Sequence, residues 1–103
     1  EYFSLQTLES MHQIIKHSQE RFNPKLTYRL LISHLDHRAK LHKRVYAQIE
    51  EHNRPLLLKT AIGSDIKLPE SQLAGIPISI YAPSSRAAKQ FQTLTQEILE
   101  IIK

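Results

Sequence analysis

The densest group of chemically active side chains is a basic run of eight residues, 37–44. It contains four fixed positive charges, Arg38, Lys40, Lys43 and Arg44, and two histidines. Charges at this density suit contacts with nucleic-acid phosphates, and a solvated basic helix start is the alternative interpretation. Cations at the amino end of a helix oppose the helix dipole, which favours a functional reason for their presence.

The excess of positive charge is confined to the central third of the chain. The net charge is +4, and between residues 37 and 67 seven Lys and Arg outnumber three acidic residues. The flanking segments are balanced, and Lys67 closes the basic segment. If a polyanion binds, we expect it to contact the middle of the chain.

Phosphate-binding and thiol chemistry are missing from the sequence. The two glycines, Gly63 and Gly75, belong neither to a GxxxxGK(S/T) loop nor to a GxGxxG loop. The chain has no cysteine, which excludes disulfides and cysteine-ligated metals. We therefore expect no nucleotide hydrolysis by these 103 residues alone.

Metal-binding and hydrolytic patterns are weak. His34, Asp36 and His37 form the tightest potential metal cluster, but no HExxH spacing occurs, which favours hydrogen-bonded or solvated loop histidines. Ser33, His34 and Asp36 have the residue types of a hydrolytic triad, yet neighbours along one strand point to opposite faces. We expect neither a metal site nor a catalytic residue.

The elements that must position these residues alternate between helix and strand. Periodicity and stop signals predict a helix from about Ser4 to Asn23-Pro24, a doubly buried strand over Leu26–Leu35, a helix over Lys40–His52, a strand over Leu56–Ile62 and a final helix capped by Ser84 or Ser85. The first helix should bury one face.

Between the second strand and the final helix the sequence predicts little regular structure. Residues 63–65 should form a loop, and the stretch through Pro69, Gly75, Pro77 and Pro83 should be irregular, with a short extended run over Ile78–Tyr81.

This order predicts an α/β fold, the C-terminal portion of a doubly wound, mostly parallel sheet. The chain begins at Glu1 and its strands lack neighbours, so we interpret residues 1–103 as an incomplete part of one domain whose N-terminal half is missing. The loops 36–40 and 63–67 should lie at the same carboxyl edge of the sheet, where open α/β folds bind ligands.

Five segments in this order resemble the C-terminal part of the ParA/Soj/MinD-like partition ATPases, on the ParA side of that group. Residues 1–5 with the following helix resemble the Glu-Tyr pair before the family's leucine-rich helix, and residues 30–38 (LLISHLDHR) its LLTMYDxRT-like strand. Residues 59–71 resemble its KTVIPRNVRLSEAP segment, residues 75–78 its GKPI segment, and residues 81–88 its YDPxSRGA segment. The resemblance covers essentially the whole chain.

The resemblance implies a P-loop NTPase-like, deviant Walker ATPase that dimerises on ATP, binds DNA non-specifically and responds to a ParB-like centromere-binding protein. It implies ATP and Mg²⁺ in the full-length protein, none for the isolated chain, and a cytoplasmic, nucleoid-associated protein without membrane contact. It places the phosphate-binding half of the domain N-terminal to Glu1. Arg38 and Lys67 fall on positions where the family carries DNA-contacting basic residues, and Lys40, Lys43 and Arg44 of the basic run complete the predicted DNA-binding set.

The resemblance also places the base side of the nucleotide pocket at the ends of the two strands. The residues there are Ser33, Ile62, Gly63, Ser64 and Asp65, of which residues 63–65 replace the family's Pro-Arg-Asn. The alternative is a non-enzymatic basic α/β module that binds nucleic acid or an acidic protein.

Overall fold

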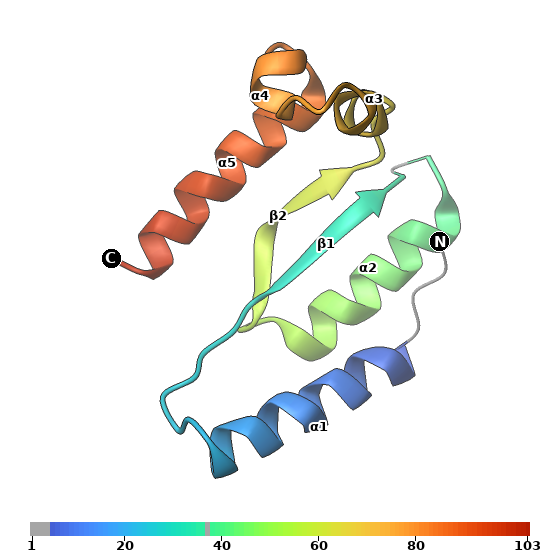
Figure 1. Ribbon diagram of the computed structural model, residues 1–103. Helices are drawn as coiled ribbons and strands as arrows, with labels where there is room; N and C mark the ends of the chain where they lie inside the picture. Colours follow the sequence, from blue (N-terminus) through green and yellow to red (C-terminus); the bar gives the residue numbers. More distant parts are fainter. Residues whose placement is uncertain (1–4, 37) are drawn as a thin grey trace.

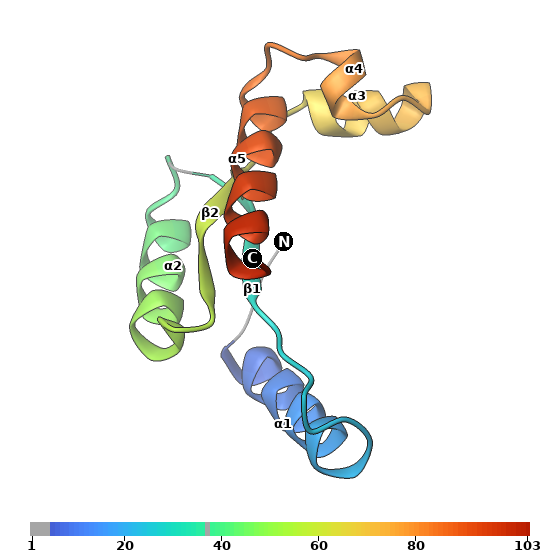
Figure 2. The same ribbon diagram turned by 90° about the vertical axis from the view of Figure 1, so that its left-hand side faces the viewer.

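Two parallel strands lie between helices in the computed structural model, which describes residues 5–36 and 38–103 (Figure 1). Strand β1 (Leu30–Leu35) pairs in parallel with β2 (Leu57–Gly63), and α2 (Lys40–Asn53) connects them. Figure 2 shows α2 on one side of the strands and α5 (Arg86–Ile101) on the other. The predicted α/β class and the parallel pairing of these strands are confirmed.

Helix α5 begins where its capping residue predicts. Ser85 has extended backbone angles, φ −69° and ψ 157°, and its Oγ accepts a 3.1 Å hydrogen bond from the backbone N–H of Ala88. Such an N-cap satisfies one of the donors that a helix start leaves without an intrahelical partner. Ala87, Ala88 and Leu94 form the buried face of the helix.

The hydrophobic core lies between β2 and α5. Leu58 and Ile62 of β2 pack with Leu94 of α5, and Leu68 packs against this cluster. Ile62 is 2% exposed, and burial of such a side chain stabilises the fold by about 1.5–3 kcal/mol. On the other face of the strands, Ile49 of α2 is equally buried.

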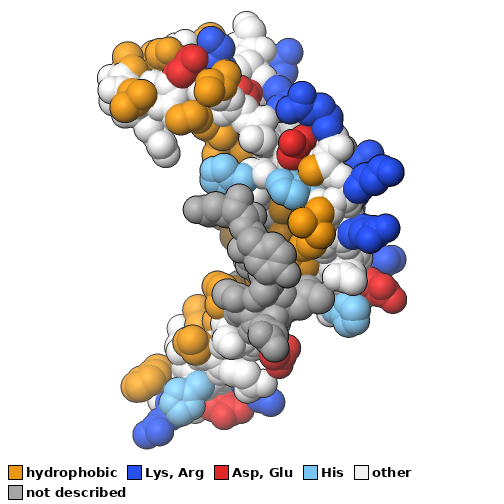
Figure 3. Space-filling view, turned by 90° about the vertical axis from the view of Figure 1, so that its right-hand side faces the viewer, with side chains coloured by type: hydrophobic (Ala, Val, Ile, Leu, Met, Phe, Trp, Pro, Cys, Tyr) orange, Lys and Arg blue, Asp and Glu red, His pale blue; other side chains and the backbone are white. Residues whose placement is uncertain are grey.

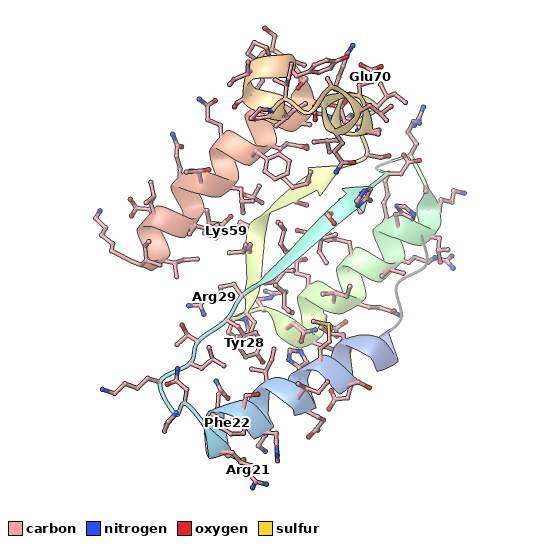
Figure 4. All side chains as sticks on the ribbon, viewed as in Figure 1. Arg21, Phe22, Tyr28, Arg29, Lys59 and Glu70 are labelled. Carbon is pink, nitrogen blue, oxygen red and sulfur yellow. The ribbon has the colours of Figure 1, made fainter. Side chains whose placement is uncertain are left out.

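Helix α1 (Leu5–Arg21) ends just before Asn23-Pro24, as predicted, whereas the proposed cap Ser4 lies outside the described residues. The expectation of one buried face is wrong for most of the helix, because Leu8 is buried but Met11 is 46% exposed. The same holds for Phe22, just beyond the helix, which is 80% exposed and lies at the end of the helix in Figure 4. The other elements pack only sparsely against α1, so Met11 and Phe22 stay exposed.

A histidine attaches α1 to the rest of the molecule. His12 Nε2 lies 2.8 Å from Asn53 Oδ1, and His12 Nδ1 lies 2.8 Å from the Tyr28 hydroxyl. Asn53 is buried and its Nδ2 donates to the Ile49 carbonyl, so its Oδ1 is the acceptor and His12 Nε2 the donor. This chain of hydrogen bonds joins α1 to the end of α2.

The first strand is shorter and less buried than predicted. It starts at Leu30, because the Leu26 backbone is used locally: its N–H donates to Asn23 O and its carbonyl accepts from Gln19 Nε2. Burial on both faces is also wrong, since only Leu35 of β1 is buried and Leu31 is 41% exposed. The helices pack mainly over β2.

The stretch predicted to be irregular contains two helices, α3 (Lys67–Ala74) and α4 (Ile78–Tyr81). Pro69 is tolerated because it lies in the first turn of α3, where backbone N–H groups have no intrahelical partner. Gly75 ends α3 with φ 67°, the left-handed conformation that glycine adopts without strain. Pro77 precedes α4 as its N-cap, so the extended run predicted for Ile78–Tyr81 is helical instead.

The pairing of the two strands is irregular at two places. Partners are Leu30 with Leu57, Ile32 with Ala61, and Leu35 with Gly63. β2 therefore has extra residues in the first interval and β1 has one extra residue in the second. In the first interval, the backbone N–H groups of Lys59 and Thr60 donate to Glu97 of α5.

None of the helices within the described part of the chain combines the length and apolar character that crossing a membrane requires.

Candidate functional site

A cavity of about 880 Å³ lies where both strands end. Ser33 lines it from β1, and Ile62, Ser64 and Asp65 line it from β2 and the following loop. Gly63 ends β2 between Ile62 and Ser64. The structure thus brings the five residues predicted for the base pocket to one edge of the sheet, and four of them line one cavity.

Asp65 is the structural centre of the loop after β2. Its Oδ1 accepts from the Lys67 backbone N–H and its Oδ2 from the Ala87 backbone N–H, each at 3.0 Å. The hydrogen bond from Lys67 N–H is the main reason that the pKa of Asp65 lies below its ordinary value. Asp65 is therefore a carboxylate at neutral pH that joins the starts of α3 and α5.

Gly63 is buried and closely surrounded. A Cβ there would lie 3.4 Å from the Leu35 carbonyl oxygen and 3.5 Å from Gln90 Nε2. Its backbone N–H donates to Gln90 Oε1 at 2.9 Å. The last residue of β2 is thus held between β1 and α5, which sets the position of the loop that follows.

The sequence reasoning did not assign most of the other cavity residues, and three of them come from helices distant from the two strand ends. Arg86 and Phe91 of α5 and Gln72 of α3 line the same cavity. Arg86 Nη2 also donates to the Ser64 carbonyl. No local pattern marks these residues, since they reach the loops only through the packing of α3 and α5.

The loop after β1 is organised by Asp36. The backbone N–H of Arg38 donates to Asp36 Oδ1 at 3.0 Å, and this hydrogen bond is the main reason that the pKa of Asp36 is lowered. Arg38 Nε also lies 3.4 Å from Asp36 Oδ1, although the Arg38 side chain is 93% exposed. His42 of α2 accepts the Asp36 backbone N–H through Nδ1, so this histidine of the basic run anchors the loop.

The predicted DNA-contacting residues surround this edge. Arg38 lines the cavity, and Lys40, Lys43 and Arg44 are exposed on the first two turns of α2. In Figure 3, Lys and Arg side chains follow the margin of the molecule formed by α2 and the loops above it. Lys67 begins α3, and its Nζ lies 3.3 Å from Glu70 Oε1. Within the described residues, the three cations of α2 have no ion pair, so their charge faces solvent.

Across residues 5–36 and 38–103, no three His, Asp or Glu side chains are grouped so that they could hold a metal ion. His37, a member of the weak cluster considered from the sequence, lies outside the described residues.

The fold and the cavity define an α/β protein with a ligand-sized site at the carboxyl edge of a parallel sheet, where open α/β folds bind their ligands. The family model for the cellulose biosynthesis protein BcsQ matches residues 8–99. The chain belongs to this BcsQ/ParA family of ATPases, as a C-terminal portion of such a protein. The resemblance inferred from the sequence is confirmed.

Curated relatives match nearly the whole chain. An uncharacterized protein of Pseudomonas putida is 35% identical over 100 residues, covering 96% of this chain and 38% of the relative. The sporulation initiation inhibitor protein Soj of Bacillus subtilis is 29% identical over 99 residues (95% and 39%). The chromosome-partitioning ATPase Soj of Treponema pallidum is 30% identical over 100 residues (96% and 40%). The chain thus spans about two fifths of the length of these relatives.

Proposed function

We propose that this chain forms the base side of the nucleotide pocket and part of the DNA-binding surface of an ATPase that partitions plasmids or chromosomes. One observation carries the proposal: the cavity at the carboxyl edge contains Ser33, Ile62, Ser64 and Asp65, with Arg38 at the same edge. Its volume of about 880 Å³ is in the range of small-molecule sites.

The DNA-binding part of the proposal is supported by the unpaired, exposed cations of α2. Lys40, Lys43 and Arg44 lie beside the loop that carries Arg38, and Lys67 starts the helix after the other loop. Such a surface binds phosphates without reading base sequence, because its contacts are electrostatic. Nucleotide bound at the edge would then lie next to the DNA-binding surface.

The remaining parts of the proposal concern the full-length protein. We expect it to bind ATP with Mg²⁺, to form an ATP-dependent homodimer on nucleoid DNA and to respond to a ParB-like protein. The 103 residues alone contain no phosphate-binding loop, so the isolated chain should neither hydrolyse ATP nor bind it tightly. ATP turnover by a purified sample of the isolated chain, above contaminant controls, would contradict this part.

The pocket is tested by filling it. Ser64→Trp in the full-length protein places an indole at the cavity wall from an exposed position, so the fold should tolerate it. Calorimetric titration should show that ATP and ADP affinities both fall by at least about tenfold, because both nucleotides carry the same base. Ser79→Trp on α4 is the matched control, since Ser79 is exposed and does not line the cavity. Unchanged affinity in Ser64→Trp would refute the proposed pocket.

A further inference from the structure

His34 has an unusual backbone conformation at the end of β1. Its φ is 58°, and it is the one non-glycine residue with positive φ within residues 5–36 and 38–103. The conformation coincides with the extra residue of β1 between Ile32 and Leu35. β-Bulges and left-handed residues of this kind occur preferentially near functional sites, where they re-aim side chains.

His34 also occupies a distinctive position relative to the cavities. It lines the 880 Å³ cavity at the carboxyl edge and a second, 440 Å³ cavity between α1, β1 and α2. Its ring Nδ1 lies 3.3 Å from Ser33 Oγ, a long contact, and within the described residues Nε2 has no hydrogen bond. As far as the described residues are concerned, the exposed ring is therefore open to a ligand.

The composition of the carboxyl-edge cavity suits a flat heteroaromatic ligand with a polar rim. Ile62, Leu68 and Phe91 supply apolar surface, and Ser64 and Gln72 supply groups that donate or accept hydrogen bonds. Asp65 contributes less to recognition, because both of its carboxylate oxygens already accept backbone hydrogen bonds. An additional planar group at the cavity wall would hold such a ligand by stacking on its face.

We propose that His34 is the base-stacking residue of this pocket, held by its left-handed backbone so that the imidazole lies against the face of a nucleobase. The inference rests on the proposed function and adds a specific contact to it. The competing explanation is that the bulge merely turns the chain toward α2. The two explanations predict different nucleotide affinities for variants of His34 that relieve the backbone strain and lack the ring.

His34→Gly and His34→Asn separate the ring from the backbone. Glycine adopts positive φ without strain and asparagine tolerates it, so both variants should fold at least as well as wild type in thermal melts. Both lack the imidazole. In the full-length protein we expect each to bind ATP and ADP about tenfold more weakly, with the same factor for both nucleotides, whereas His34→Phe should stay within about threefold of wild type because stacking is kept.

Inorganic tripolyphosphate is the second probe, because it has no base. Its affinity should be the same in wild type and in all three variants. A parallel loss of tripolyphosphate affinity, wild-type ATP affinity in His34→Gly, or an equal loss in His34→Phe would each overturn the stacking role and leave the pocket itself standing. If wild type binds neither ATP nor ADP, the proposed function and this inference both fail.

Discussion

Asp65 Oδ2 accepts a 3.0 Å hydrogen bond from the backbone N–H of Ala87, which connects the loop after β2 to the first turn of α5. The other oxygen of the same carboxylate holds the first turn of α3 through Lys67. One short side chain therefore fixes two helix starts around the carboxyl-edge cavity. The arrangement also explains how the negative charge of Asp65 is accommodated at this edge of the sheet, because both carboxylate oxygens face backbone N–H groups.

Removing this carboxylate should loosen both helix starts. Asp65→Ala leaves two backbone donors without their acceptor, and we expect the full-length protein to lose about 1–3 kcal/mol of unfolding free energy. Asp65→Asn keeps one acceptor oxygen and should lose roughly half as much. Chemical denaturation measures the unfolding free energies of wild type, Asp65→Asn and Asp65→Ala, which should fall in that order. Equal stability of Asp65→Ala and wild type would show that the two hydrogen bonds contribute nothing.

Glu97 provides a pH-dependent contact between α5 and β2. Its oxygens accept the Lys59 and Thr60 backbone N–H groups at 2.6 and 2.9 Å. Partial burial raises the pKa of Glu97, but the hydrogen bonds from Thr60 and Lys59 outweigh it, so the pKa is lowered overall. A lowered pKa in the folded state means that the stabilisation is present above the unfolded pKa of about 4.3 and is lost as pH falls through the folded value.

Glu97→Gln should therefore be less stable than wild type at pH 7, by about 1–3 kcal/mol, because the amide keeps only one acceptor. The difference should start to shrink as pH falls below the unfolded pKa of about 4.3, and it should vanish once pH has passed through the lower folded pKa, below which wild-type Glu97 is protonated in both states. Thermal melts from pH 3 to pH 7 test this. Glu100→Gln is the control on the same helix, since Glu100 is exposed and its ion-pair partner is the exposed Lys103. A pH-dependent effect of that size in the control would contradict the assignment.

The exposed cations of α2 should contribute to DNA binding independently of base sequence. Lys40→Ala, Lys43→Ala and Arg44→Ala should each weaken binding of the full-length protein to unrelated duplexes by similar factors and reduce the salt slope by about one unit. Binding curves at several salt concentrations measure both effects. A variant that changes the preference between duplexes and leaves the slope intact would contradict a phosphate contact.

Reversing the charge of Arg38 and Lys67 together should abolish DNA association of the full-length protein at physiological salt. Replacing each cation by an anion removes an attraction to DNA phosphates and adds a repulsion. Asp36 and Glu70, the acidic neighbours of the two residues, add to the negative charge there. Arg29→Glu is the control, because Arg29 is exposed at the amino end of β1, opposite the cavity edge (Figure 4). DNA binding as strong as wild type in the double variant would refute the proposed surface.

The isolated chain should self-associate or be marginally stable. In the described two-stranded sheet, the outer edge of β1 has no strand neighbour, and Leu31 of that strand is 41% exposed. Unpaired edges of this kind pair with other chains, and a lysine on the edge opposes the pairing. Sedimentation should show less association for Leu31→Lys than for Leu73→Lys, which changes a 91% exposed residue on α3. A cooperative, stable monomer at high concentration would contradict the prediction.

The sequence by itself determined the elements whose signals are local. The helical periods of α1, α2 and α5, the stop at Asn23-Pro24 and the cap at Ser85 are readable because each depends on residues within one or two turns. Strand order and the carboxyl-edge location of Ser33 and residues 62–65 follow from the alternation of helix and strand. The family resemblance was visible for the same reason, as short segments in a fixed order.

Only the tertiary structure decided how these pieces meet. Helices α3 and α4 were missed because Pro69, Gly75 and Pro77 read as breakers, although each occupies a helix end where it is tolerated. Asp65 accepts a hydrogen bond from Ala87, 22 residues away, and Glu97 accepts one from Lys59, 38 residues away. The left-handed backbone of His34 coincides with a shift in strand register. Such contacts form only after the chain has packed, so no local pattern of residues could specify them.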